Sequence, residues 1–244
     1  MLDYASICEI GDRNANEDCV AAQERNGNYC FLVCDGLGGH GMGDIASQFV
    51  SDTFLKQFLS CNTYENFLPA TFSLAQTNLV EHQEKNNACD KMRTTAAALV
   101  ADKESVSIGY IGDSRVYVFD SNGIKIRTID HSVPQMLALA GDIDEQDIRK
   151  HPDRNKILRA MGSFWSDPMY SLLPSLKLSE CRAFLLCSDG FWEYITEEEM
   201  VTLLNSTSSA EAWLSAMASL VKQHGATAKM DNYSAITVIN PAYL

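Results

Sequence analysis

The residues best suited to chemistry in this 244-residue chain are aspartates that stand where apolar segments end. Three of them adjoin a glycine at the end of an apolar run, and two lie within two residues of an asparagine: Asp35, Asp113 and Asp189, then Asp18 and Asp231. One such aspartate alone is usually a turn residue, because Asp and Gly both accept the backbone angles of tight turns. Five carboxylates would repel one another if these ends met, so their convergence would demand a cation.

The types of side chain in this set indicate which cation it would be. Ligands that offer only oxygen select hard divalent ions, so the expected cofactor is Mn2+ or Mg2+. The five histidines form no H-x-x-x-H or similar cluster, which disfavours zinc. Arg13 lies five residues before Asp18, and its planar guanidinium could hold two oxygens of a phosphate. The alternative for Arg13 is an ordinary surface ion pair with Asp12 or Glu17.

Two other patterns point to different chemistry, and each lacks a required part. Residues 36–41 match the G-x-G-x-x-G of dinucleotide-binding folds, but Asp35 would repel a pyrophosphate and no second parallel strand with a ribose-binding acid follows. Cys19 and Arg25 have the C-x5-R spacing of cysteine phosphatases. No glycine lies between them to build an anion-binding loop, and Asp18 beside the thiol would raise its pKa.

The hydropathy pattern indicates which elements position these residues. Period-two segments predict a hairpin over 19–34 that turns at 26–28, a four-strand meander over 94–129, and strands at 170–178, 182–188 and 234–239. Helical spacing predicts helices over about 45–59, 67–84, 196–205 and 209–223. Because strands and helices come in blocks, we expect an α+β fold of antiparallel sheets covered by helices, in one domain spanning 1–244. Residues 130–168 are polar and contain three prolines, so we expect an insertion or flap beside a site.

Composition and charge exclude several classes of protein. With 19 Lys+Arg and 32 Asp+Glu, the net charge of −13 argues against a surface for nucleic acid or for an anionic membrane. The chain shows neither a secretory leader nor an apolar run of roughly 18 residues, so we expect a cytoplasmic protein without a membrane segment. The eight cysteines form no C-x-x-C pair and four lie in apolar runs, which favours free thiols in a reducing compartment.

Eight segments of the chain resemble the motifs of a known family, and they occur in the order that the family has. They are RNANED at 13–18, DGLGGHGMGD at 35–44, TTAAAL at 94–99, GDSRVYVF at 112–119, DHS at 130–132, HPDRNKILRAMG at 151–162, LLCSDGFWE at 185–193 and DNYSAITV at 231–238. The chain thereby resembles, over nearly its whole length, the metal-dependent serine/threonine phosphatases of type 2C, the PPM family, in their bacterial form. This resemblance implies two antiparallel β-sheets packed as a sandwich with helices on both sides, and a dinuclear metal centre at one end.

The resemblance also implies roles for the metal-ligating residues. Asp35 is similar to the carboxylate that bridges both metals. Asp189 and Asp231 would complete one metal site, and the carbonyl of Gly36 would serve the other. Asp113 matches the acid that supports a third, weaker metal in bacterial members.

Two further residues match catalytic positions of the family. Asp18 resembles the acid that holds a metal-bound water, with help from Glu17, and Arg13 matches the phosphate-binding arginine. Two metal ions would activate a water as hydroxide for in-line attack on phosphorus. One departure concerns the proton donor: Leu37 stands where eukaryotic members have histidine, so the general acid is left to a metal-bound water or to His40.

The expected function is hydrolysis of phosphoserine and phosphothreonine in proteins, opposite a eukaryotic-like Ser/Thr kinase. The expected partners are therefore phosphorylated proteins, and residues 131–161 fall where the family has a flap that influences substrate choice. The alternative is a catalytically silent regulatory module that binds phosphoproteins with the same fold. A silent member is expected to lack one or more of the ligand carboxylates, whereas Asp18, Asp35, Asp189 and Asp231 are all present. A purely structural metal site would have no use for Arg13.

Overall fold

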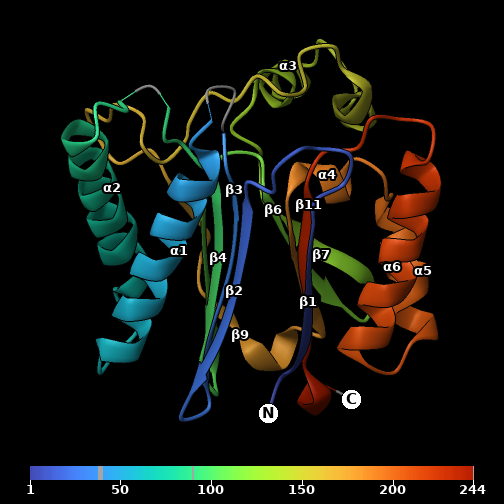
Figure 1. Ribbon diagram of the computed structural model, residues 1–244. Coiled ribbons are helices and arrows are strands. Elements are labelled where there is room, and N and C mark those ends of the chain that lie inside the picture. The colour runs from blue at the N-terminus through green and yellow to red at the C-terminus, as the bar shows by residue number, and fades with distance from the viewer. Residues whose placement is uncertain (38–40, 90, 244) are drawn as a thin grey trace.

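Two antiparallel β-sheets lie face to face, and helices cover the outer face of each sheet (Figure 1). This computed structural model describes residues 1–37, 41–89 and 91–243. The arrangement confirms the predicted α+β sandwich with helices on both sides. Among the described residues, no helix combines the length and the hydropathy that a membrane crossing needs.

The first sheet begins with the predicted hairpin. Asn26 and Gly27 both have positive φ, at 56° and 79°, which is the geometry that favours Asn-Gly in a two-residue turn. The strand order is β2-β3-β4-β5-β8, with β9 also paired to β5. The bounds are β2 Asp18–Arg25, β3 Asn28–Asp35, β4 Ala96–Ala101, β5 Ser105–Ile111, β8 Ser171–Leu172 and β9 Leu176–Lys177.

The second sheet joins the two ends of the sequence. Its order is β1-β11-β10-β6-β7, so the last strand pairs with the first, with Asp3 opposite Ile239. The bounds are β1 Asp3–Glu9, β6 Arg115–Asp120, β7 Gly123–Arg127, β10 Ala183–Cys187 and β11 Tyr233–Ile239.

The predicted four-strand meander over 94–129 is wrong, because the chain changes sheet in the middle of it. Strands β4 and β5 belong to the first sheet, and β6 and β7 belong to the second. The crossing occurs at Gly112, whose φ of +98° turns the chain sharply between the two sheets. The predicted strand 170–178 is likewise broken into β8 and β9. Pro174 lies between them, and proline removes a donor from the ladder.

The helices form wherever apolar residues recur at helical spacing. In α1, Ala46, Val50, Phe54 and Phe58 are fully buried four residues apart and face the first sheet. Helix α5 begins with a capping box between Thr196 and Glu199. The bounds are α1 Gly43–Ser60, α2 Phe67–Lys85, α3 Val133–Ala140, α4 Asp189–Trp192, α5 Glu197–Ser206 and α6 Ala210–Gly225, with short 3₁₀ turns η1 Glu145–Lys150, η2 Leu178–Glu180 and η3 Pro241–Tyr243.

Each sheet is buried on both faces. One core lies between the sheets, a second lies under α1 and α2, and a third lies under α5 and α6. In β10, all residues from Ala183 to Cys187 are therefore fully buried, so polar side chains are confined to the ends of such strands. Residues 131–161 contain only the short elements α3 and η1 and lie over the end of the sandwich next to α4 (Figure 1).

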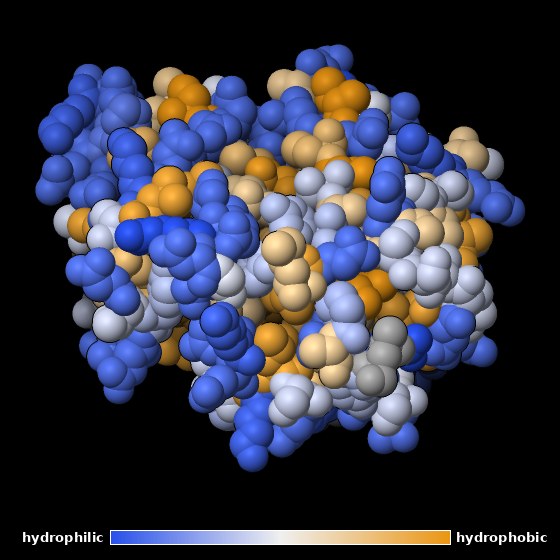
Figure 2. All heavy atoms as spheres, turned by 90° about the horizontal axis from the view of Figure 1, so that it is seen from below, coloured by the Kyte–Doolittle hydropathy of each residue, from blue (hydrophilic) through white to orange (hydrophobic). Residues whose placement is uncertain are grey.

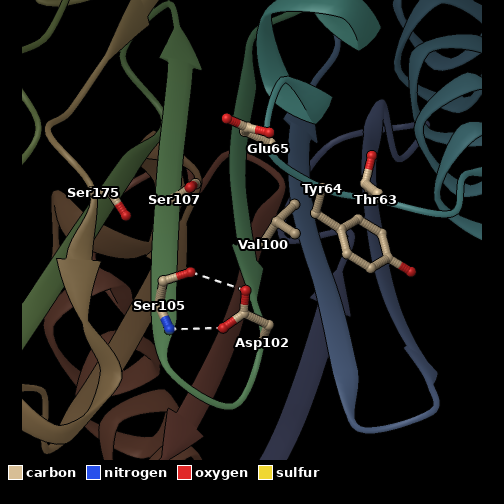
Figure 3. Close-up of a pocket in the computed structure, with 8 residues that line it drawn as sticks. All are labelled: Thr63, Tyr64, Glu65, Val100, Asp102, Ser105, Ser107 and Ser175. Carbon is tan, nitrogen blue, oxygen red and sulfur yellow. Dashed lines mark hydrogen bonds between the residues drawn. The ribbon is translucent and has the colours of Figure 1, made fainter.

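The opposite end of the sandwich has a different character. It holds the hairpin turns of both sheets, and hydrophilic side chains are interspersed there with smaller apolar areas (Figure 2). A cavity of about 450 Å³ lies toward this end, between the segment that joins α1 to α2 and strands β4 and β5 (Figure 3). Of the two carboxylates that line it, Glu65 and Asp102, the second already accepts hydrogen bonds from the backbone N–H of Ser105 at 2.7 Å and of Glu104 at 2.8 Å. This cavity contains none of the predicted site residues.

Candidate active site

The five predicted aspartates gather at one end of the sandwich, because the strands that carry them start or stop there. Asp18 begins β2 and lies directly opposite Asp35, which ends β3. Asp113 comes just before β6, and Asp189 follows β10. Asp231 comes just before β11, which pairs with β10, so segments far apart in the sequence meet here.

Asp35 lies at the centre of this group. Burial of its carboxyl group raises the pKa well above the ordinary value, and the neighbouring Asp18 and Asp189 raise it further. The backbone is fixed on both sides. Its N–H donates to Thr95 Oγ1 at 2.9 Å, and its C=O accepts from the N–H of Thr95 at 2.8 Å and from Thr94 Oγ1 at 2.9 Å. The carboxylate thus projects from a rigid strand end.

Asp18 has one satisfied and one unsatisfied oxygen. Ser188 Oγ donates to Oδ2 at 2.8 Å, whereas the buried Oδ1 finds no hydrogen-bond partner in the described part of the chain. Burial raises the pKa of Asp18 to about 7. A buried oxygen with unused lone pairs is costly unless a cation or a proton meets it.

Asp113 repeats this pattern on the second sheet. The residue is 2 % exposed, and its Oδ1 also lacks a hydrogen-bond partner among residues 1–37, 41–89 and 91–243. Burial raises its pKa well above the ordinary value, and Asp189 contributes in the same direction. Its backbone C=O accepts a hydrogen bond from Trp192 Nε1 at 3.0 Å.

Asp189 is the first residue of α4 and remains partly exposed to solvent. Burial of its carboxyl group raises the pKa to about 6, with a further contribution from Asp231. Asp231 itself forms an ion pair with Arg13. That hydrogen bond raises the pKa of Arg13, and the charges of Asp189 and Asp35 act in the same sense. The guanidinium that the sequence predicts as a phosphate ligand therefore faces the same carboxylates.

Two glycines permit the close packing around Asp231. A Cβ on Gly11 would lie 2.1 Å from the backbone oxygen of Asp231, and a Cβ on Gly190 would lie 2.1 Å from that of Asn232. Gly11 also has a φ of +59°. The loop that carries Arg13 can approach Asp231 only because glycine stands at position 11.

Gly36 lies at the base of the same site. Its N–H donates to the C=O of Glu17 at 3.0 Å, and a Cβ there would lie 2.4 Å from Gly43. Leu37 follows it, as predicted, and donates its N–H to the C=O of Arg93 at 2.8 Å. His40, one of the two predicted sources of the leaving-group proton, lies outside the described residues.

The donor set fits hard divalent cations. It consists of carboxylate oxygens that repel one another, and two of those oxygens are buried without a hydrogen-bond partner in the part of the chain that the structure describes. Among the residues that the structure describes, no group of three or more His, Cys, Asp or Glu side chains is arranged so that it could hold a metal ion by itself.

Several residues of the site had no prediction of their own. Ser188 orients Asp18, and Asn232 donates its side-chain N–H to the C=O of Ile10 at 2.8 Å while its Oδ1 accepts from the N–H of Glu17 at 2.9 Å. Both are sequence neighbours of predicted aspartates, and this adjacency could have indicated that they belong to the site. Glu193 lies beside the cluster, and burial raises its pKa to about 7. Its ion pair with Arg154, at 2.8 Å, joins positions 39 residues apart and had no sequence signal.

The rejected cysteine mechanism finds no support in the structure. The Sγ of Cys19 donates to Gln48 Oε1 at 3.5 Å, and burial raises the pKa of the thiol. Arg25 lies at the far end of β2, where it donates to the C=O of Leu59 at 2.6 Å and of Cys61 at 2.8 Å. All eight cysteines are free thiols, and Cys30, Cys34, Cys181 and Cys187 are buried, as predicted.

Comparisons with known proteins agree with this site. The family model described as Protein phosphatase 2C matches residues 9–233. The serine/threonine phosphatase stp of Listeria welshimeri is 31% identical over 204 residues, which cover 81% of this chain and 80% of that protein. The crystal structure of the serine/threonine phosphatase Stp1 from Staphylococcus aureus superposes with a TM-score of 0.90 at 29% identity, covering 98% of this chain and 95% of the other.

A further neighbour is the catalytic domain of the serine/threonine protein phosphatase PstP, solved in complex with two manganese ions. It has a TM-score of 0.80 at 23% identity and covers 98% of this chain and 97% of that one. The family match and the Listeria relative both extend over most of the sequence, and the family match, over residues 9–233, includes all five aspartates of the cluster. The chain therefore belongs to the protein phosphatase 2C family and is a serine/threonine protein phosphatase that acts on phosphorylated proteins.

Proposed function

We propose that the aspartate cluster binds two divalent ions, Mn2+ or Mg2+, and hydrolyses phosphoserine and phosphothreonine in proteins that a Ser/Thr kinase has modified. The observation that carries this proposal is a pair of buried carboxylate oxygens, on Asp18 and Asp113, that have no hydrogen-bond partner among the described residues and whose charges act on the buried carboxyl of Asp35. Mutually repelling carboxylates in one place are costly without cations. The PstP catalytic domain with its two manganese ions has the same fold.

The chain offers distinct ligands for these ions. Asp35 interacts electrostatically with all four other aspartates, so its carboxylate, those of Asp189 and Asp231 and the C=O of Gly36 would hold two of these ions. Asp113, which interacts with Asp189, would hold a third ion. When bound, such ions supply positive charge to the phosphate oxygens and make a water nucleophilic near neutral pH.

The side chains around the ligands would bind the substrate and accept or supply protons. Arg13 is half exposed beside Asp231, so its guanidinium can bind the phosphate oxygens while it keeps one contact to the carboxylate. Ser188 donates to one oxygen of Asp18, which leaves the other oxygen as an acceptor for the attacking water. Leu37 has no proton to give, so the seryl or threonyl oxygen takes its proton from elsewhere in the site.

Loss of ligand carboxylates would mark the alternative, a silent phosphoprotein-binding module. Asp18, Asp35, Asp189 and Asp231 are all retained and meet at one end of the sandwich, which supports the enzyme.

Hydrolysis of a phosphothreonine peptide before and after removal of metal tests the proposal. Protein dialysed against EDTA should be inactive, and added MnCl2 should restore activity. Asp189→Ala should lower turnover by about 10³-fold or more, because a metal site supplies several kcal/mol to the transition state. Cys19→Ser is the matched control and should stay within about twofold of wild type. Full activity after EDTA treatment, or an inactive Cys19→Ser variant, would contradict the proposal.

A further inference from the structure

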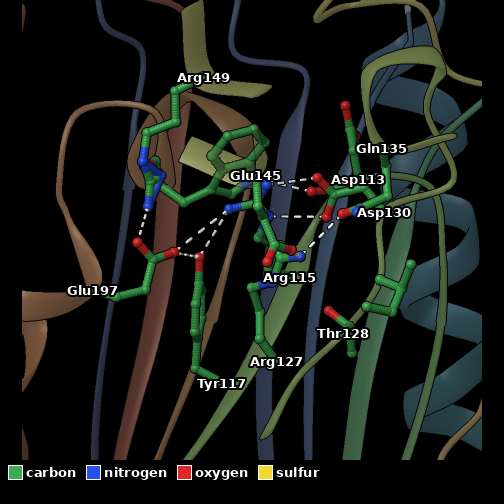
Figure 4. Close-up of polar contacts among 12 residues, drawn as sticks. Asp113, Arg115, Tyr117, Arg127, Thr128, Asp130, Gln135, Glu145, Arg149 and Glu197 are labelled. Carbon is green, nitrogen blue, oxygen red and sulfur yellow. Dashed lines mark hydrogen bonds and ion pairs between the residues drawn. The ribbon is translucent and has the colours of Figure 1, made fainter. Parts of the chain in front are cut away.

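A buried cation lies directly behind the site and takes no part in the proposed chemistry. Arg115 is 1% exposed, and its guanidinium lies 3.4 Å from the ring centre of Trp192. Nε and Nη2 donate to the two carboxylate oxygens of Asp130 at 2.9 and 2.6 Å, and Nη1 donates to Tyr117 Oη at 3.1 Å (Figure 4). A buried charge is tolerated when it is paired and hydrogen-bonded in this way, so the ring of Trp192 rests on a rigid support.

Trp192 connects this support to two of the proposed metal ligands. Its Nε1 donates to the backbone C=O of Asp113 at 3.0 Å. It also ends α4, the single helical turn that begins with Asp189. Because Oδ1 of Asp113 has no hydrogen-bond partner in the described chain, the position of its backbone decides where that carboxylate lies. Movement of Trp192 would therefore move both ligands.

Arg149 also contacts Trp192. It belongs to η1, within residues 131–161, and its Nη1 donates to the backbone C=O of Trp192 at 3.0 Å. Its guanidinium also lies 5.7 Å from the ring centre, within the range of a cation–π contact. The Nη2 of Arg149 pairs with Glu197 at 2.6 Å, and Glu197 accepts from Tyr117 Oη at 3.1 Å (Figure 4). Trp192 thus contacts two arginines.

We propose that Arg149 is a positioning residue that couples the segment 131–161 to the metal site through Trp192. When Arg149 is docked on Trp192, α4 and the turn before β6 are fixed, and Asp189 and Asp113 are held for metal. When the segment moves and Arg149 leaves, these ligands are less well ordered and metal binding weakens. The inference rests on the proposed function, because it assumes that this cluster binds divalent ions.

The same segment provides a matched control. Arg127 on β7 binds Gln135 at 3.0 Å and pairs with Glu145, the first residue of η1. Its side chain is 13% exposed and that of Arg149 is 14% exposed, so the two substitutions remove arginines that are buried to a similar extent. Arg127 contacts Gln135 and Glu145 of the segment, whereas Arg149 contacts Trp192 and Glu197 of the body. Comparison of the two separates loosening of the segment from loss of the Trp192 contact.

The test is calorimetric titration of Mn2+ into EDTA-treated, dialysed protein, which measures binding without turnover. Arg149→Met should raise the dissociation constant for Mn2+ about tenfold, as is usual when a residue behind a metal ligand is removed. Arg127→Met should leave it within about twofold. Glu197→Gln weakens the hold on Arg149 at a partly exposed position, and it should also raise the dissociation constant. It keeps the inference testable if Arg149→Met folds poorly.

Wild-type affinity in both Arg149→Met and Glu197→Gln would overturn the inference, and so would equal weakening in Arg149→Met and Arg127→Met. Both results leave the proposed metal site intact, because wild-type protein still binds Mn2+. If the wild type itself takes up no Mn2+, the proposed function fails and this inference fails with it.

Discussion

At the scale of single residues, substitution of Arg13 tests substrate binding separately from metal binding. Its guanidinium pairs with Asp231 and remains half exposed, so it is available to a phosphate. Arg13→Ala should raise KM for a phosphothreonine peptide about tenfold, because one charge-assisted contact to the substrate is worth about 1.5 kcal/mol. The rate at saturating substrate should change less, provided that Mn2+ is also saturating.

Initial rates over a range of peptide concentrations measure both parameters. Arg13→Lys keeps the charge without the planar fork and should give an intermediate KM. An unchanged KM in Arg13→Ala would show that the phosphate is held by other groups, and that the ion pair with Asp231 is the whole role of this side chain.

The predicted aspartates were accessible to sequence reasoning because carboxylates at strand ends are unusual together. Their partners were not, because their importance lies in distances across the fold. In the sequence Ser188 is an ordinary residue at a strand end. In the fold its Oγ donates a hydrogen bond to Asp18, 170 positions away. The Arg13–Asp231 pair joins residues 218 positions apart, whereas the sequence offered Asp12 and Glu17 as nearer partners.

At the scale of elements, the turn at Gly112 decides whether β6 joins the correct sheet. An added Cβ at this position would lie 2.5 Å from Thr95 Cγ2, and φ is +98°. Gly112→Ala should therefore lower the free energy of unfolding by about 3 kcal/mol, from backbone strain together with steric overlap. It should also reduce activity, because Asp113 is the next residue.

Gly141 offers the control for strain alone. It ends α3 with φ of +82°, but nothing lies within 4 Å of an added Cβ. Gly141→Ala should cost only about 1 kcal/mol. Urea denaturation measures the free energy of unfolding of both variants. An equal decrease in the two variants would show that the steric overlap with Thr95 adds nothing to the cost of backbone strain.

Local sequence patterns predicted most elements but not how they pair. The hairpin at Asn26-Gly27, the four long helices and the last strand were confirmed within a few residues, because turn chemistry and periodicity are local properties. The change of sheet at Gly112 was missed. A period-two pattern predicts which residues of a strand face the core, but it does not predict which other strand pairs with it.

At the scale of the whole molecule, the aspartate cluster makes stability depend on pH and on metal. Without metal, the pKa of Asp18 is about 7, compared with about 3.9 in an unfolded chain. The folded protein then binds more protons than the unfolded chain between these values, so this group contributes stability at low pH that is lost as pH rises through 7. Asn has nearly the same shape as Asp but cannot ionise, so Asp18→Asn avoids this loss. It should therefore raise the free energy of unfolding of metal-free protein at pH 7.5 by a few kcal/mol.

The measurement is urea unfolding of EDTA-treated wild type and Asp18→Asn at pH 5 and pH 7.5. His131 has the opposite effect, since burial lowers its pKa to about 4 and its contribution is lost as pH falls below about 6.5. The difference between the two proteins cancels His131, which is present in both. A gain in Asp18→Asn that is the same at both pH values would contradict a protonation effect.

The position of β11 has a consequence for the synthesis of the protein. This strand is translated after every other strand, yet it lies between β1 and β10 in its sheet, and the residue two before it is Asp231. A nascent polypeptide that still has this segment inside the ribosome lacks both the middle of one sheet and a proposed metal ligand. We therefore expect dephosphorylation only after β11 has left the ribosome and paired with β1 and β10.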